Sequence, residues 1–77
     1  LNQLSSLDVS KNMVLTYLDC GSNQLSILDV NKNTKLTDLY CSFNRLSSLD
    51  VSKNTELENL SYDNTVTVIG KENTKLN

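Results

Sequence analysis

The chain has 77 residues, with seven Lys and Arg against nine Asp and Glu and a formal net charge of −2. This length accommodates one small domain whose hydrophobic core is marginal unless the architecture is regular. The acidic balance lacks the basic footprint of a nucleic-acid binder, and no segment reaches the roughly 18 consecutive apolar residues of a membrane-spanning helix. We therefore expect a single domain over residues 1–77 that neither binds nucleic acid nor inserts into a membrane.

The sequence repeats with a period of 21 residues. A nine-residue phrase recurs as LSSLDVSKN at 4–12, LSILDVNKN at 25–33 and LSSLDVSKN at 46–54. A period in the twenties is typical of solenoids, in which each repeat forms one coil. The repeats span 2–22, 23–43 and 44–64, and a degenerate last coil at 65–77 brings the total to about 3.5 coils. Because the chain opens at Leu1, partway through a repeat, we expect it to be a piece of a longer protein.

Each repeat predicts two very short strands. In the first repeat the apolar residues alternate at Leu7 and Val9, and again at Leu18 and Cys20, with turn-forming polar clusters between them. Stacked coils about 4.8 Å apart would bury these residues in columns. The predicted columns are Leu4/Leu25/Leu46, Leu7/Leu28/Leu49, Val9/Val30/Val51, Leu15/Leu36/Leu57 and Leu18/Leu39/Leu60.

Asparagine recurs at both predicted bends. The first bend carries Asn12, Asn33 and Asn54, with Asn73 as a fourth member, and the second carries Asn2, Asn23 and Asn44. A stacked side-chain amide offers both a donor and an acceptor to backbone groups that lose their strand partners at a bend. We interpret both columns as structural.

The two cysteines, Cys20 and Cys41, lie one repeat apart and therefore share an inward column. We expect buried free thiols that act as small hydrophobes, the alternative being a disulfide between neighbouring coils. Two thiols in a chain without His do not make a zinc site.

The sequence offers little support for catalysis. The absence of His excludes the usual Ser-His-Asp and Cys-His arrangements, and two glycines, Gly21 and Gly70, do not form a phosphate-binding loop. The glycosylation-type triplet Asn59-Leu60-Ser61 falls on a predicted strand and is interpreted as a chance match. We expect no enzymatic activity, no catalytic residues and no cofactor.

The segments LTYLDCGSNQL at 15–25 and LTDLYCSFNRL at 36–46 resemble the leucine-rich-repeat signature L-x-x-L-x-[LC]-x-x-N-x-L. The length of the repeat, with LDVSKNT between the signatures, is similar to that of internalin-like surface proteins of bacteria, and the match covers residues 2–64. The resemblance implies a β-rich solenoid of short parallel strands with little or no helix. It also implies an extracellular or cell-surface, non-enzymatic module that binds another protein along its strand face.

The pattern changes after Leu60. TVTVIG at 65–70 replaces the usual LSSLDV and predicts a final strand, while ENTKL at 72–76 echoes KNTEL at 53–57 two positions earlier than the repeat requires. Terminal coils of solenoids are commonly atypical. An uncovered parallel-strand edge invites pairing, so we also predict end-to-end self-association.

The outward positions of the second strand differ between repeats, which is the pattern expected of a surface shaped by a partner. The predicted binding residues are Tyr17, Asp19, Asp38, Tyr40, Asn59 and Ser61, with Phe43 and Arg45 at the edge. Tyrosine is favoured at interfaces. The competing interpretation is drift on an unselected surface. Carbohydrate binding and a passive spacer role are the alternative functions.

The outward positions of the first half of each repeat are constant, and Asp8, Asp29 and Asp50 recur there. The structural interpretation is that each carboxylate accepts hydrogen bonds from a neighbouring coil or pairs with the lysine three positions on. These lysines are Lys11, Lys32 and Lys53. The alternative is a calcium-binding ladder, because carboxylate oxygens suit a hard cation.

Overall fold

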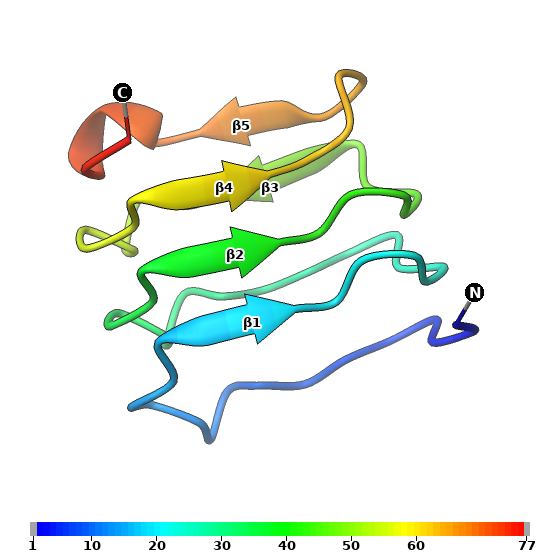
Figure 1. Ribbon diagram of the computed structural model, residues 1–77, viewed down its shortest axis with the longest axis horizontal. Helices are drawn as coiled ribbons and strands as arrows, with labels where there is room; N and C mark the ends of the chain where they lie inside the picture. The colour runs from blue at the N-terminus through cyan, green and yellow to red at the C-terminus, as the bar shows by residue number, and fades with distance from the viewer. Residues whose placement is uncertain (1, 77) are drawn as a thin grey trace.

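The computed structural model describes residues 2–76 and shows a parallel β-solenoid (Figure 1). The elements in chain order are β1 (Tyr17–Asp19), β2 (Asp38–Tyr40), β3 (Ser48–Asp50), β4 (Asn59–Ser61), β5 (Thr67–Ile69) and the 3-10 helix η1 (Lys71–Asn73). In Figure 1 the arrows of β3 and β5 point against those of β1, β2 and β4, as the two halves of a coil require. Within residues 2–76, no helix is long and apolar enough to cross a membrane.

The strands form two parallel sheets whose registers differ. In the sheet β1-β2-β4, Tyr17 pairs with Asp38 and Asp38 with Asn59, so each partner lies one full repeat further along the chain. In the sheet β3-β5, Ser48 pairs with Thr67, which comes two positions before a full repeat is complete. The predicted final strand is confirmed, and it pairs across the shortened interval that the sequence echo indicated.

The hydrophobic core follows the predicted columns most closely in the middle of the molecule. The fully buried side chains include Leu25, Leu36, Leu39, Leu49, Leu57, Val30, Val51 and Cys41. The first coil departs from the prediction, because Leu4 is 48% exposed, and Leu7, Leu15 and Leu18 are half-buried. Within residues 2–76 this coil has a neighbouring coil on one side, which covers its apolar side chains in part.

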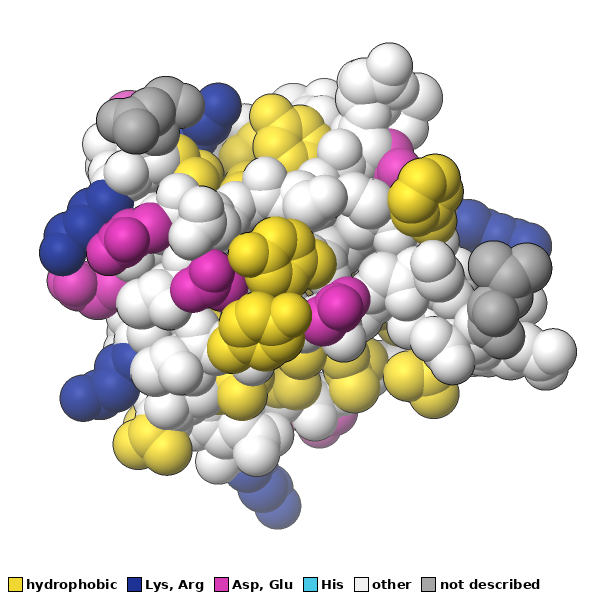
Figure 2. Space-filling view, viewed as in Figure 1, with side chains coloured by type: hydrophobic (Ala, Val, Ile, Leu, Met, Phe, Trp, Pro, Cys, Tyr) yellow, Lys and Arg dark blue, Asp and Glu magenta, His cyan; other side chains and the backbone are white. Residues whose placement is uncertain are grey.

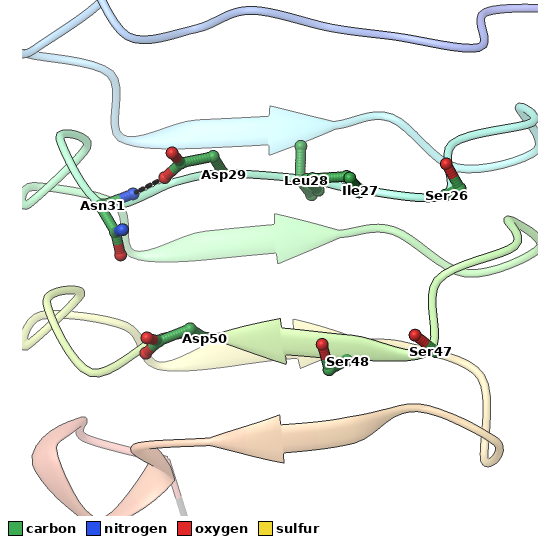
Figure 3. A pocket seen from close by; sticks show the side chains of 8 residues that line it. All are labelled: Ser26, Ile27, Leu28, Asp29, Asn31, Ser47, Ser48 and Asp50. Carbon is green, nitrogen blue, oxygen red and sulfur yellow. Dashed lines mark hydrogen bonds between the residues drawn. The ribbon is translucent and has the colours of Figure 1, made fainter.

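The predicted first strand is wrong for the first two repeats. Leu7–Val9 and Leu28–Val30 carry no strand, and in the third repeat β3 pairs forward with β5. Contacts at the ends of the segment hold these coils together instead: Arg45 N donates to Leu25 O at 2.8 Å, and Asn54 Nδ2 to Val30 O at 3.0 Å. Between those ends lies an open hollow of about 280 Å³, lined by residues 26–29, 31, 47, 48 and 50 (Figure 3). The hydrogen bonds between these coils are therefore confined to the ends of the segment.

The asparagine columns hold both bends. At the second bend, Asn44 Nδ2 donates to Cys20 O at 3.0 Å and its Oδ1 accepts from Leu25 N at 2.9 Å, so donor and acceptor are both used as predicted. At the first bend, Asn33 and Asn54 are completely buried and their Nδ2 groups donate to carbonyls of the preceding coil. Their Oδ1 atoms have no hydrogen-bond partner among the described residues. Asn73 is exposed and reaches Ser52 O at 3.4 Å.

Candidate binding site

The sheet β1-β2-β4 presents one continuous outward face, and the six predicted binding residues lie on it. They are Tyr17 and Asp19 of β1, Asp38 and Tyr40 of β2, and Asn59 and Ser61 of β4. The register places Tyr17 beside Asp38 and Asp19 beside Tyr40, so aromatic and acidic residues alternate across the first two strands. The fold thus brings together residues that lie two full repeats apart, such as Tyr17 and Asn59.

Two tyrosines form an aromatic pair at the centre of this face. The ring centroids of Tyr17 and Tyr40 are 5.5 Å apart and the ring planes are tilted by 56°, a favourable geometry for aromatic contact. Tyr17 remains 55% exposed. Figure 2 shows hydrophobic side chains in the middle of the face with acidic side chains on either side. The pair is an apolar surface available to a partner.

Asp38 is the centre of a hydrogen-bond network. Its carboxylate accepts from Thr37 Oγ1 at 2.6 Å, Asn59 Nδ2 at 3.0 Å and Tyr40 Oη at 3.2 Å. These donors, Thr37 first, hold the pKa of Asp38 below its usual range. Partial burial and the contact with Asp38 raise the pKa of Tyr40. The network fixes the Tyr40 ring and leaves Asp38 little capacity for a ligand.

The Asp19 carboxylate accepts fewer hydrogen bonds than the Asp38 carboxylate does. Its Oδ1 accepts from the backbone N–H of Gly21 at 3.0 Å, whereas Oδ2 has no hydrogen-bond partner within residues 2–76. Asp19 forms one wall of an open, mainly polar hollow of about 510 Å³ at the end of β1 and β2. The other lining residues are Asn2, Gly21, Ser22, Tyr40, Ser42 and Phe43.

Phe43 stands at the edge of this hollow in an unusual conformation. Its φ is +61° and its side chain is 74% exposed, although bulky residues rarely adopt positive φ. The Asp63 carboxylate holds the turn by accepting from Phe43 N at 2.9 Å and Asn44 N at 3.3 Å. Ser22, one repeat earlier, has φ +59°, so the bend recurs while the aromatic side chain does not. Arg45, the other predicted edge residue, is exposed two positions further on.

Sequence reasoning missed Thr37 and Asp63. Thr37 precedes Asp38 and supplies its shortest hydrogen bond, while Asp63 occupies the repeat position of Gly21 and Ser42. A residue that is acidic in one copy and small in the others is a signal that column-by-column comparison could have found.

The constant aspartates of the first half have a local role. The carboxylates of Asp8, Asp29 and Asp50 each accept from the backbone N–H two residues on at 2.9 Å. The predicted partners, a neighbouring coil or the lysine column, are wrong, because a short Asp side chain reaches its own turn first. The ion pair that the described residues form joins Lys75 to Glu56 at 2.9 Å on the exposed surface.

These turns account for the constancy of the aspartates without a metal. Hydrogen bonds from the hydroxyl and then the amide of the serine two residues on hold the pKa of Asp8 and Asp50 below the usual range. Within residues 2–76, no group of three His, Cys, Asp or Glu side chains is arranged to hold a metal ion. The structure therefore does not bring the proposed calcium ladder together.

The cysteines are buried free thiols, and the disulfide considered as their alternative is not formed. The Cys41 thiol donates to Ser61 O at 3.3 Å. Burial raises the pKa of Cys20 to about 11 and that of Cys41 to about 12, so neither thiol ionises near neutral pH. Both belong to the core rather than to a reactive site.

Comparisons with known proteins bear on the fold. Neither a protein-family model nor a curated protein matches this sequence. A functional domain of InlJ from Listeria monocytogenes, described as including a cysteine ladder, matches 84% of this chain with a TM-score of 0.58 and 29% sequence identity. The fold is that of an internalin-like leucine-rich repeat. The part of InlJ that matches makes up 21% of the InlJ chain.

The two cysteines of this chain form a short column. Cys20 N donates to Tyr40 O and Cys41 N donates to Ser61 O, both at 2.9 Å, so the two residues occupy equivalent positions after β1 and β2. Tyr62 follows β4 at the same position and packs half-buried against the core. The column begins where the strands of the candidate binding face end.

Proposed function

We propose that this array of leucine-rich repeats is a protein-binding module of a secreted or cell-surface bacterial protein, and that it binds through the β1-β2-β4 face. The observation that carries the proposal is the Tyr17–Tyr40 pair, in which Tyr17 is 55% exposed and the half-buried Tyr40 is held by its hydrogen bond to Asp38. Rigid, amphipathic tyrosines are the residues that dominate binding energy at protein interfaces. The fold shared with InlJ supports a role in molecular interaction.

Carbohydrate binding is the second candidate, since a sugar can stack on Tyr17 and Tyr40. A sugar also needs free polar groups around the aromatic platform. Beside the platform, Asp38 and Asn59 already bond to each other at 3.0 Å, which leaves Asp19 Oδ2 as a carboxylate oxygen next to Tyr40 without a partner within residues 2–76. The face therefore favours a protein partner over a glycan.

The test is capture of surface proteins by the module, followed by affinity measurement on the partner that mass spectrometry identifies. Replacing both tyrosines (Tyr17→Ala with Tyr40→Ala) should weaken that binding about 100-fold, because each removes an interfacial aromatic. Ile27→Ser is the matched control, since Ile27 is 76% exposed but lines the hollow on the other half of the coil. The proposal would be refuted if the wild-type protein, the double tyrosine variant and Ile27→Ser bound the partner with equal affinity. Selective binding of the wild-type protein on a glycan array would favour carbohydrate binding instead.

A further inference from the structure

Charge is segregated between the two halves of each coil. Residues 16–22, 37–43 and 58–64, which contain β1, β2 and β4, include no Lys or Arg. They carry four carboxylates, Asp19, Asp38, Glu58 and Asp63. All seven basic residues of the chain lie outside these segments, with Arg45 at the edge of the face. The candidate face is therefore locally acidic, and its field attracts positively charged groups.

The carboxylates on this face are not equivalent. Asp38 is engaged by three side-chain donors, and Asp63 is engaged by the amides of Phe43 and Asn44. Asp19 uses Oδ1 for Gly21 N and keeps Oδ2 without a partner within residues 2–76. Asp19 and Glu58 are thus the carboxylates with an oxygen available for a ligand, and of the two it is Asp19 that lines the hollow at the end of β1 and β2.

Two aromatic residues border this mainly polar hollow. Tyr40 and Phe43 line it together with Asp19, and Phe43 is held there at positive φ by the Asp63 carboxylate. A cation close to an aromatic face is attracted by the ring, and a planar guanidinium combines this attraction with paired hydrogen bonds to a carboxylate. Carboxylate and rings in one hollow therefore match a basic side chain.

We infer that this hollow receives an arginine or lysine side chain from the protein partner. The cationic group donates to Asp19 Oδ2 and lies beside the rings of Tyr40 and Phe43. The inference rests on the proposed function and names the chemistry of the partner at this point of the face. Arginine fits better than lysine, because its planar group can stack and bond at the same time.

The experiment uses short peptides and NMR. A pentapeptide Gly-Ser-Arg-Ser-Gly with blocked ends is titrated into the isotope-labelled protein, and the amides of Gly21, Ser22 and Phe43 are followed. The citrulline peptide is the neutral control of equal shape. We expect the arginine peptide to bind about 10-fold more tightly than the citrulline peptide, and to weaken as salt is added.

Two variants make the test specific to Asp19. Asp19→Asn should weaken arginine-peptide binding about 10-fold, because it removes the charge and keeps an oxygen for Gly21 N. Asp29→Asn is the matched control, since the Asp29 carboxylate is also exposed and also accepts from the amide two residues on, at 2.9 Å. It should leave peptide binding unchanged.

Several outcomes would overturn the inference. They are equal affinities for the arginine and citrulline peptides, equal losses in the two Asp variants, and no shift at the hollow up to about 10 mM peptide. A captured partner that needs the tyrosines but is indifferent to Asp19→Asn also overturns it, while the proposed function stands. A partner that is indifferent to the tyrosines removes the proposed function itself.

Discussion

At the scale of single residues, Asn33 and Asn54 show how one side chain secures a bend. Each is completely buried, and each amide group donates to two carbonyls of the preceding coil at 2.8–3.0 Å. The same carbonyls also accept from backbone N–H groups of their own turns, so the side-chain amide is a second donor to each of them. These asparagines therefore link neighbouring coils through hydrogen bonds whose individual net gain is about 1 kcal/mol.

Replacing Asn54 with Ala should lower the free energy of unfolding by about 1–3 kcal/mol, because Val30 O and Asn33 O each lose one of their two donors and a completely buried side chain is removed. The matched control is Asn12→Ala in the same column. Asn12 is exposed, and its side chain makes no hydrogen bond with the described residues, so the expected loss is under about 1 kcal/mol. Urea denaturation measures both, and similar losses would contradict this account of the column.

At the scale of elements, the pairing of β5 with β3 depends on Gly70. Gly70 follows β5 with φ +81°, and a Cβ at this position would lie 2.4 Å from Ser52 Cβ and 2.5 Å from Ser52 Cα. Such contacts are far inside van der Waals distance, so the backbone after β5 approaches the backbone after β3 as closely as it can. The interval from β3 to β5 is two residues shorter than a full repeat, and the two backbones meet closely at Gly70.

Gly70→Ala should therefore destabilise the protein by about 2 kcal/mol or more, through the clash with Ser52 and through the positive φ. Hydrogen exchange should show the loss first at Val51 N, which donates to Ile69 O across the β3–β5 sheet at 2.9 Å. Gly21→Ala is the control, because its Cβ would meet Ser42 O at 3.3 Å, a contact that a small shift relieves. Unchanged protection of Val51 in Gly70→Ala would contradict the prediction.

At the scale of the whole molecule, stability is distributed along one dimension. Each coil contacts its neighbours alone, so central positions gain contacts from two sides and terminal positions from one. The column Leu18, Leu39 and Leu60 illustrates this, because the middle leucine is fully buried and the outer two are half-buried. The predicted end-to-end self-association belongs to this scale too and stays a prediction.

Leu39→Ala should cost about 2–5 kcal/mol of unfolding free energy, since it leaves a cavity between two coils. Leu18→Ala, in the same column, should cost roughly half as much, because the side chain starts half-exposed and its site can collapse. Thermal and urea unfolding of the two variants supply the comparison. Equal losses would mean that the coils are not the units of stability.

The repeat pattern predicts the apolar columns, the last strand and the asparagine bends, because inward residues and turn residues recur at fixed positions. It does not predict that Leu28–Val30 lacks a strand. Alternation shows which side chains point inward, whereas backbone pairing depends on the distance between coils. The Asp29 turn was accessible from local chemistry, since Asp commonly bonds two residues on.

The candidate site is predictable in part. The six variable positions do share a face, as their place in the repeat indicates, but their binding role stays a prediction. The hollow beside Asp19 could not be predicted, because it depends on the positive φ of Phe43 and on Asp63 one coil away. Asp63 stands out when the repeats are compared position by position, but the comparison shows neither the conformation of Phe43 nor the hydrogen bonds between the two residues.

The two registers of the solenoid determine how such a chain can change in length. The β1–β2 and β2–β4 interfaces have the same register, in which residues one full repeat apart are paired. A duplicated repeat inserted between residues 43 and 44 would therefore pair with both neighbouring coils in that register. It would widen the recognition face by one strand, about 4.8 Å. The β3–β5 interface, whose interval falls short of a full repeat, offers no such insertion point. Duplication of a repeat can therefore widen the β1-β2-β4 face of this protein and leave the β3–β5 pairing of the last coil unchanged.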